Sequence, residues 1–301
     1  MFCSVYHIFR TIFHVKLFLP IYINIILFNY PMNNYSGTYF PPLIEPEKKP
    51  DTLPIVPNNI VPVENSEKPI DFEKKTKPVP TVQYYVKFSF TLTYILLLTT
   101  ATITIIEAIR TPIPVVRHVL NLETCISVVA GYFYSVFTGK IDEFSQKNIA
   151  IDWGEITKTR YIDWSITTPM MLLTLCLVLG QNIDVPVKLW VIGTIVLLNY
   201  AMLYIGYLGE SEIITKWLAM LGGFVPFFAM FALIFYQFVN PTKNLANSVL
   251  FSIYLFVWSM YGVVYMFNEN YKNIAMNILD CTAKCFVGLG LWAYYTKIIV
   301  L

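Results

Sequence analysis

The sequence predicts an all-α protein in which seven helices form a transmembrane bundle. Hydrophobic residues make up 56% of the 301 residues and charged residues only 13%, whereas about a quarter of the residues in soluble domains are charged. From Gln83 onward the chain contains seven apolar stretches. Each is long enough to cross a hydrocarbon core of about 30 Å as a helix of about 20 residues. The composition therefore excludes an ordinary soluble protein and requires a lipid bilayer.

Three regions follow one another along the chain. Residues 1–30 are apolar and aromatic, and they could be an uncleaved anchor, a signal-like segment, or sequence upstream of a true start at Met32. Residues 31–82 form a linker, because 41–80 alone holds ten of the 18 prolines and alternates acidic with basic residues. Such a segment cannot bury enough apolar area to offset its conformational entropy, so we expect it to be disordered. Residues 83–301 are expected to form the helical domain.

Prolines and polar residues mark the ends of the spans. Pro112 and Pro114 separate the first two, Asp184-Val-Pro186 separates the third and fourth, and Asn240-Pro241 separates the fifth and sixth. The longest connection, Gly139–Thr157, is polar and follows the second span. The spans are expected at about 84–109, 115–138, 156–180, 186–208, 213–238, 245–267 and 271–298.

Charge placement gives weak information on orientation and partners. Lysine and arginine counts in the loops lean slightly toward an N-terminus outside and a C-terminus in the cytoplasm. The net charge is only +2 and no basic cluster carries interleaved aromatics, so nucleic acid is not an expected partner. The five cysteines lie mostly in apolar runs without paired metal spacing, and we interpret them as small buried hydrophobes. No metal site is predicted.

Four ionisable residues fall in the middle of two spans. Arg160 and Asp163 lie three residues apart in the third span, and Asp280 and Lys284 lie four apart in the seventh, so each pair shares a helix face. A charge within the membrane costs about 3 kcal/mol on insertion scales and is a functional candidate by default. The structural alternative is a charge cluster that holds helices together. A desolvated lysine amine is also suited to forming a Schiff base, and a protonated imine would need an anion nearby.

At these residues the sequence resembles the microbial (type 1) rhodopsins. A second set of residues, Asn121-Leu-Glu-Thr-Cys-Ile-Ser127, Glu107 and Lys272-Asn273, resembles the rhodopsins encoded by giant viruses, a group that includes light-gated cation channels and proton-moving oligomers. Arg160-Tyr-Ile-Asp-Trp-Ser-Ile-Thr-Thr-Pro169 resembles the third helix of the family, and Leu279-Asp-Cys-Thr-Ala-Lys284 resembles its retinal-attachment motif. Trp258-Ser-Met-Tyr-Gly-Val-Val-Tyr265 resembles the pocket wall of the sixth helix, with Gly262 in place of a proline and Tyr265 in place of a tryptophan. The resemblance covers roughly 83–300.

The resemblance implies a pocket for all-trans-retinal and assigns roles to its residues. Lys284 would carry retinal as a protonated Schiff base, with Asp163 and Asp280 as counterions and Arg160 one turn toward the outside. Tyr261 would donate a hydrogen bond to Asp280. Thr168 would pair with Asn199 of the fourth span, for which a helix-packing amide is the structural alternative. The remaining residues implied in the pocket are Trp164, Thr167, Met171, Trp258 and Tyr265.

The family contains pumps, channels and sensors, and three residues bear on the choice. Outward proton pumps usually carry a carboxylate where this chain has Thr174, and an acidic group where it has Lys272-Asn273. We therefore predict a light-gated cation channel, with a slow light-driven proton pump or a sensory photoreceptor as alternatives. Monovalent cations or protons are the expected cargo, and a homo-oligomer is expected from the resemblance. Only four residues follow Lys297, so we expect no fused enzymatic domain and no enzymatic activity.

Glu123, in Asn121-Leu-Glu-Thr-Cys-Ile-Ser127 of the second span, is the main candidate for the ion path. It is expected to lie on a face with Ser127, away from the retinal motifs, where its oxygens would attract and ligate cations. The structural alternative pairs it with Arg117 or with an arginine of a neighbouring subunit. A column of serines and threonines on the first span would line the path, unless these hydroxyls only bond their own helix backbone. The other predicted ion-path residues are Arg160, Glu107, Arg117, Lys272 and Asn273.

Overall fold

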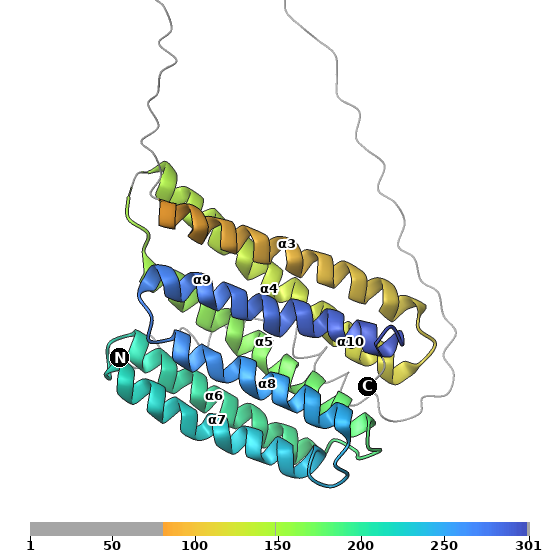
Figure 1. Ribbon diagram of the computed structural model, residues 1–301. Coiled ribbons are helices and arrows are strands. Elements are labelled where there is room, and N and C mark those ends of the chain that lie inside the picture. Colours follow the sequence, from red (N-terminus) through yellow and green to blue (C-terminus); the bar gives the residue numbers. More distant parts are fainter. Residues whose placement is uncertain (1–80, 148, 300–301) are drawn as a thin grey trace, which may run out of the picture. The chain divides into compact units, whose positions relative to one another are not determined.

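The computed structural model describes residues 81–147 and 149–299, and within them every regular element is a helix. The apolar region expected at 1–30, and all but the last residues of the linker expected at 31–82, lie outside the described residues. Helices α3 to α10 run up and down as a bundle (Figure 1). Their bounds are α3 Thr81–Arg110, α4 Pro114–Gln146, α5 Trp153–Gln181, α6 Leu189–Glu210, α7 Lys216–Phe238, α8 Leu245–Val264, α9 Glu269–Asp280 and α10 Val287–Tyr295.

Seven helical spans in the described residues are long and apolar enough to cross a membrane, which confirms the predicted fold class. The chain is an integral, multi-pass membrane protein. Successive helices contact one another, and α9 returns to pack beside α3, so the bundle closes around the enclosed helix α5. The end of the bundle where α9 begins is called the Glu269 end, and the end where α10 finishes is called the Tyr295 end.

The second helix is longer than the sequence predicts. It was expected to end near 138, yet α4 continues to Gln146 and the connection to α5 shrinks accordingly. Ion pairs stabilise this polar extension. Lys140 Nζ lies 2.6 Å from Glu155 Oε1 of α5, and Lys147 pairs with Glu143 one turn earlier. Hydropathy locates the apolar part of a helix and does not indicate how far its polar end continues.

The seventh span, predicted over 271–298, is helical from Glu269 to Tyr295, but its helix type changes around Lys284. A π-helical segment, η1, spans Cys281–Phe286 and joins α9 to α10. Such segments insert an extra residue into the helical turn and are frequent at functional sites, because they redirect side chains. Here the extra residue falls in the turn that carries Lys284.

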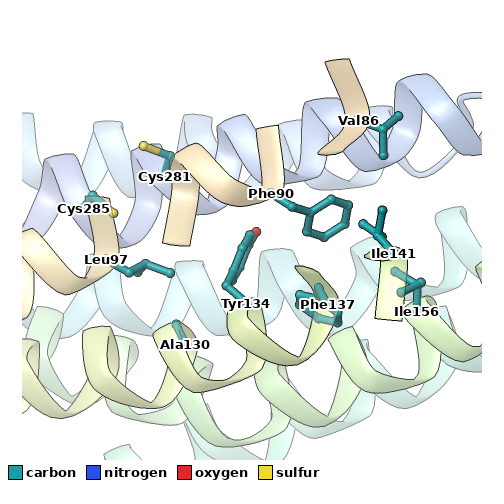
Figure 2. Close-up of a cluster of buried hydrophobic side chains, with 10 residues drawn as sticks. All are labelled: Val86, Phe90, Leu97, Ala130, Tyr134, Phe137, Ile141, Ile156, Cys281 and Cys285. Carbon is teal, nitrogen blue, oxygen red and sulfur yellow. The ribbon is translucent and has the colours of Figure 1, made fainter. Parts of the chain in front are cut away.

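A hydrophobic cluster packs α3, α4, α5 and η1 together near the centre of the bundle (Figure 2). Phe90, Tyr134 and Phe137 are its aromatic members, and their ring centroids lie 5.4 to 5.8 Å apart. This packing fixes the ring of Tyr134, which is fully buried, so that its hydroxyl reaches the polar site described below. The other members are Val86, Leu97, Ala130, Ile141, Ile156, Cys281 and Cys285.

Candidate functional site

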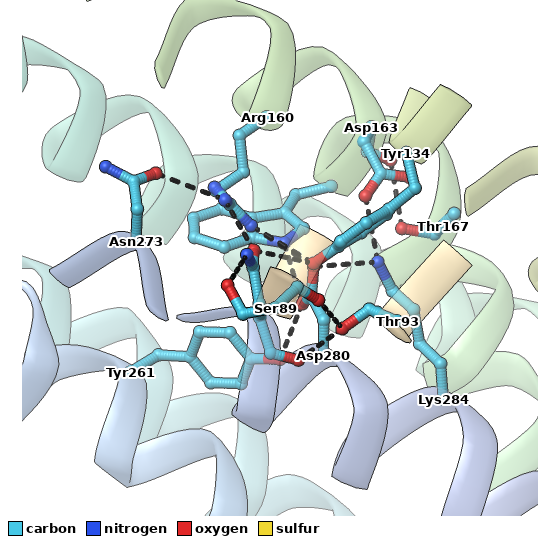
Figure 3. Close-up of polar contacts among 12 residues, drawn as sticks. Ser89, Thr93, Tyr134, Arg160, Asp163, Thr167, Tyr261, Asn273, Asp280 and Lys284 are labelled. Carbon is cyan, nitrogen blue, oxygen red and sulfur yellow. Dashed lines mark hydrogen bonds and ion pairs between the residues drawn. The ribbon is translucent and has the colours of Figure 1, made fainter. Parts of the chain in front are cut away.

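A buried ion pair between α5 and the seventh span lies at the centre of the site (Figure 3). Lys284 Nζ donates to Asp163 Oδ2 at 2.8 Å, and Asp280 Oδ2 lies 3.5 Å from the same nitrogen. All three side chains are at most 1% exposed. A buried lysine with two carboxylates in reach has its charge compensated, so the predicted pairing of the third and seventh spans is present in the structure.

Asp280 is held by donors from three helices. Tyr134 Oη of α4 donates to its Oδ2 at 2.7 Å, and Tyr261 Oη of α8 donates to its Oδ1 at 2.7 Å. Trp164 Nε1 of α5 donates to the same Oδ1 at 3.2 Å. The hydrogen bond expected between Tyr261 and Asp280 is therefore present. Three neutral donors hold this carboxylate in one orientation and stabilise its ionised form.

Arg160 lies one turn before Asp163 on α5, toward the Glu269 end, as expected. Its Nη2 donates to Asn277 Oδ1 at 2.8 Å and to Asn273 Oδ1 at 3.2 Å. Its Nη1 lies 3.3 Å from Tyr134 Oη and 3.5 Å from Asp280 Oδ2. The guanidinium therefore joins α4, α5 and α9 in one hydrogen-bonded layer.

Tyr134 and Asn277 are site residues that sequence reasoning missed. Asn277 had a usable signal, because it lies three residues before Asp280 and seven before Lys284 on one helix stripe. Tyr134 had none, since it is one aromatic among many and only the packing of its ring against Phe90 of α3 and Phe137 holds its hydroxyl at Asp280.

A cavity extends from Lys284 between α5, α6, α7 and α8, and its lining is mostly aromatic and aliphatic. Small-molecule sites are typically lined in this way, with a few polar groups that fix the orientation of the ligand. Most of the residues predicted for the pocket line it, namely Trp164, Thr168, Met171, Trp258, Tyr261, Tyr265, Asp280 and Lys284. Helices α6 and α7 complete the wall with residues that the motifs did not indicate, among them Met202, Leu203, Phe224 and Phe227.

Two predicted pocket residues lie behind the wall. Asp163 reaches the site only through its ion pair with Lys284. Thr167 is fully buried and its hydroxyl donates to the backbone oxygen of Asp163 at 2.9 Å, which supports the backbone at the counterion position. Neither is among the residues that line the cavity.

The two departures from the sixth-helix motif are structurally accounted for. The ring of Phe224 packs directly on Gly262, so that a Cβ on this residue would overlap the ring. Tyr265 donates from its hydroxyl to the backbone oxygen of Gly206 at 3.0 Å and so ties α8 to α6. The predicted pair between the third and fourth spans is also present, because Asn199 Nδ2 donates to Thr168 Oγ1 at 2.9 Å.

The residues that line the cavity fit retinal. A lysine amine stands at one end of an elongated wall of aromatic and methionine side chains, which suits a long apolar aldehyde. Asp163 Oδ1 is buried and has no hydrogen-bond partner among the described residues, so it can accept from a group on Lys284.

The predicted ion-path residues fall into two separate parts of the bundle. At the Glu269 end, Arg160 bonds Asn273, and Lys272 Nζ lies 3.0 Å from Glu210 Oε2 and 2.8 Å from Glu269 Oε1. Glu107 and Arg117 lie at the Tyr295 end, where Arg117 Nη2 donates to the backbone oxygen of Thr111 at 2.9 Å. The structure therefore does not bring the six residues together.

The serine and threonine hydroxyls of the first span all bond their own helix backbone, as in the structural alternative. Each one donates to a backbone carbonyl three or four residues earlier on its own helix. Three of them also bond other helices, namely Ser89 and Thr93 to Asn277 and Thr104 to Thr124, whereas Thr99 and Thr102 are exposed on the outer face of α3. A column of free hydroxyls lining an ion path is therefore absent from α3.

Glu123 lies closer to the lysine than the sequence predicts. It is 2% exposed and packs against the seventh span at Gly288, one turn beyond Lys284. Among the described residues it makes no ion pair with Arg117, so the structural alternative within one chain does not hold.

Comparison with known proteins supports this geometry. A family described as bacteriorhodopsin-like protein matches residues 85–298. The crystal structure of viral rhodopsin OLPVRII is 42% identical, with a TM-score of 0.66 over 71% of this chain and 99% of that chain. A green-light absorbing proteorhodopsin from Gamma-proteobacterium EBAC31A08 is 25% identical over 170 residues, which span 50% of this chain and 66% of that relative. Blue light-absorbing proteorhodopsin from Med12, at 21% identity and a TM-score of 0.58, shares the fold.

The match covers all seven spans and includes the lysine and carboxylate motifs of the third and seventh. It confirms the resemblance to microbial rhodopsins close to the viral group. The chain therefore belongs to the bacteriorhodopsin-like family of microbial rhodopsins, whose members bind retinal as their chromophore.

Proposed function

We propose that this protein is a light-gated cation channel whose chromophore is all-trans-retinal bound to Lys284. The observation that carries the retinal site is the 2.8 Å contact between Lys284 Nζ and Asp163 Oδ2 at the end of the aromatic cavity. Retinal bound to the lysine would absorb visible light, and its excitation would change the contact between Lys284 and Asp163. No enzymatic activity is expected of the site.

The residues around the lysine have separate roles. Asp163 Oδ2 accepts a proton from the Lys284 nitrogen after excitation, because no other acceptor is as close. Asp280, bonded by Tyr134, Tyr261 and Trp164, remains ionised as the second counterion. Trp164 of α5 and Trp258 of α8 line the cavity and would hold the apolar ligand, and the buried aromatic wall would exclude water from it.

Two features favour a channel over an outward proton pump. Thr174 of α5 stands where pumps of this family usually carry a carboxylic donor, and Lys272 stands near the usual release position. Lys272 is bound to Glu210 and Glu269 in a buried cluster, so this position supplies no free acid. A slow proton pump is the second candidate. It is favoured by the unbroken hydrogen bonding of the Arg160 layer, through which a hydrated cation would have to pass.

Voltage clamp of cells that express the protein with retinal tests this proposal. A photocurrent that reverses with voltage and follows the cation gradient supports a channel. An outward current that persists against the gradient identifies a pump. The absence of a photocurrent, both with and against the cation gradient, identifies a sensor.

We further propose that the Glu269 end faces the outside, with the N-terminus outside and the C-terminus cytoplasmic, and that the protein forms a homo-oligomer. An antibody against a C-terminal epitope should bind only after permeabilisation. The mass of the purified pigment in detergent should exceed that of one chain.

A further inference from the structure

A second groove, separate from the retinal cavity, runs between α8 and the seventh span. Helix α8 packs against α9 and η1 but makes hardly any contact with α10, so the two helices separate toward the Tyr295 end. The groove lies in this gap, and it shares no lining residue with the retinal cavity. Aliphatic and aromatic side chains make up most of its lining.

The groove opens onto the outside of the bundle at membrane depth. Ile253 of α8 and Phe286 of η1 line it, and they are 43% and 59% exposed. Both belong to spans that are apolar and long enough to cross the membrane, so their exposed surface faces hydrocarbon. Val178 and Leu291 are buried and form its floor. Because an apolar lining does not hold water, the groove requires an apolar occupant from the membrane.

The length of the groove matches one leaflet of a bilayer. Thr282 lies at its inner end and Tyr294 at its outer end, twelve residues further along the seventh span. Twelve residues correspond to roughly 18 Å along a helix. Half of a hydrocarbon core of about 30 Å is about 15 Å. One extended acyl chain of a lipid in the leaflet at the Tyr295 end would therefore fill it.

The outer end of the groove is polar. Tyr294 Oη donates to Asn182 Oδ1 at 3.2 Å, and both residues line the groove. Asn182 Nδ2 in turn donates to Asn247 Oδ1 at 2.8 Å. Tyrosine side chains are enriched at the depth of lipid headgroups, where the ring is in hydrocarbon and the hydroxyl is among polar groups. This end of the groove is therefore placed where a lipid headgroup begins.

Positive charge flanks the polar end. Lys243 lies two residues before α8 and Lys297 two residues after α10, and both are exposed. The connection that follows Asn182 carries Asp184 and Lys188, whose charges offset one another. The two helices that bound the groove thus each have a lysine at this end, and lysines near a membrane surface attract anionic headgroups.

We propose that this groove binds one acyl chain of an anionic phospholipid, whose phosphate is attracted by Lys243 and Lys297. The end of the acyl chain would reach Thr282, which lies two residues before Lys284 in the same π-helical segment. A ligand that binds only the folded protein stabilises it, so the lipid would support the segment that carries the lysine. The site does not depend on whether the protein is a channel or a pump.

Gly290 offers a direct way to fill the groove. It lines the groove, and a Cβ on this residue would meet open space, so Gly290→Leu should occupy the groove with little strain. Gly193 of α6 is exposed and also has open space around a Cβ, but it lies outside the groove. Gly193→Leu is therefore the matched control.

Native mass spectrometry of the retinal-bound protein tests the site. The protein is mixed in detergent with equal amounts of phosphatidylglycerol and phosphatidylcholine that carry the same acyl chains. The wild type should retain one phosphatidylglycerol per chain, with a preference of roughly tenfold from the two lysines. Gly290→Leu should lose this lipid and Gly193→Leu should keep it. Retention by Gly290→Leu at the wild-type level would show that the groove is not the site.

Two exposed residues test the headgroup contact without changing the interior. The double variant Lys243→Gln with Lys297→Gln should retain the two lipids equally. Lys188→Gln, which changes an exposed lysine at the same end but outside the groove lining, should keep the preference. Equal retention of the two lipids by the wild type would refute an anionic ligand, whatever the behaviour of Gly290→Leu.

Dark thermal bleaching in nanodiscs measures the effect on the pigment. The wild type should bleach about threefold more slowly in phosphatidylglycerol than in phosphatidylcholine, because the bound lipid stabilises the folded state. This difference should vanish in Gly290→Leu and persist in Gly193→Leu. If Gly290→Leu instead lowers the mass of an oligomer and leaves lipid retention unchanged, a second copy of the chain occupies the groove and the lipid site is wrong. None of these measurements uses a photocurrent, so their outcome is independent of the channel proposal.

Discussion

Lys284 and Asp280 lie four residues apart on one span, yet Lys284 Nζ bonds Asp163 of α5 at 2.8 Å and stays 3.5 Å from Asp280 Oδ2. Asp280 is already bonded by Tyr134, Tyr261 and Trp164. The lysine itself lies in the π-helical segment Cys281–Phe286. The two carboxylates are therefore not equivalent, and only Asp163 is placed to accept a proton from the lysine.

Lys284→Ala should abolish visible absorbance, because among the described residues no other lysine lies in the cavity to form the imine. Absorption spectra of purified protein with added retinal measure this effect. Lys140→Ala, at the polar end of α4, is the control and should remain coloured. A visible band in Lys284→Ala would refute the chromophore assignment.

The wild-type pigment should absorb in the green, and Met171→Gln should shift the band to the blue. Met171 lines the cavity, and blue-absorbing relatives often carry a glutamine at this position, whose amide presents a stronger dipole to the polyene than a thioether does. Absorption maxima of the two proteins check this expectation. A blue wild-type maximum would show that another residue controls the colour.

Acidification should shift the absorption band to the red. Protonation of Asp163 removes the anion beside the cationic Lys284 nitrogen and lowers the excitation energy of the bound chromophore. Asp163→Asn should be red-shifted already at neutral pH and should show no further shift with acid. If Asp163→Asn instead titrates like the wild type, Asp163 is not the primary counterion.

Glu123→Gln should reduce the photocurrent or change its selectivity while the pigment keeps its colour. The carboxyl group lies beside Gly288, outside the cavity lining, so the substitution leaves the chromophore site intact. Current per retinal-bound molecule is the measurement, and Glu143→Gln, which changes an exposed acid near the other end of α4, is the comparison. Equal current, reversal potential and selectivity at matched pigment levels would remove Glu123 from the ion path.

Gly262→Ala should destabilise the pigment by about 1–3 kcal/mol, the usual cost of overpacking. A Cβ on this residue would overlap the ring of Phe224. Thermal bleaching in the dark measures the loss. Gly193→Ala of α6, where a Cβ meets open space, is the matched control and should bleach as the wild type does. The double variant Gly262→Ala with Phe224→Leu should recover part of the loss if the clash is the cause.

Local information in the sequence determined the membrane class, the seven spans and the core of the site. Hydropathy is summed over about 20 consecutive residues, so a span is visible without knowledge of its neighbours. Helical spacing places Arg160 and Asp163 on one face and Asp280 and Lys284 on another. Because a charged side chain is costly inside a membrane, both pairs are candidates for a functional role. These features required no contact between distant residues.

Tertiary structure alone decided how the distant groups meet. The hydroxyl of Tyr134 reaches Asp280 because its ring packs between Phe90 of α3 and Phe137, and Glu123 reaches the seventh span because Gly288 lacks a Cβ. An ion pair joins the polar end of α4 to α5, and a π-helical segment carries Lys284. Helical periodicity fixes which residues share a face, but the rotation and depth of one helix against another depend on close packing summed over many side chains. That sum is a property of the folded bundle and cannot be read from any single segment.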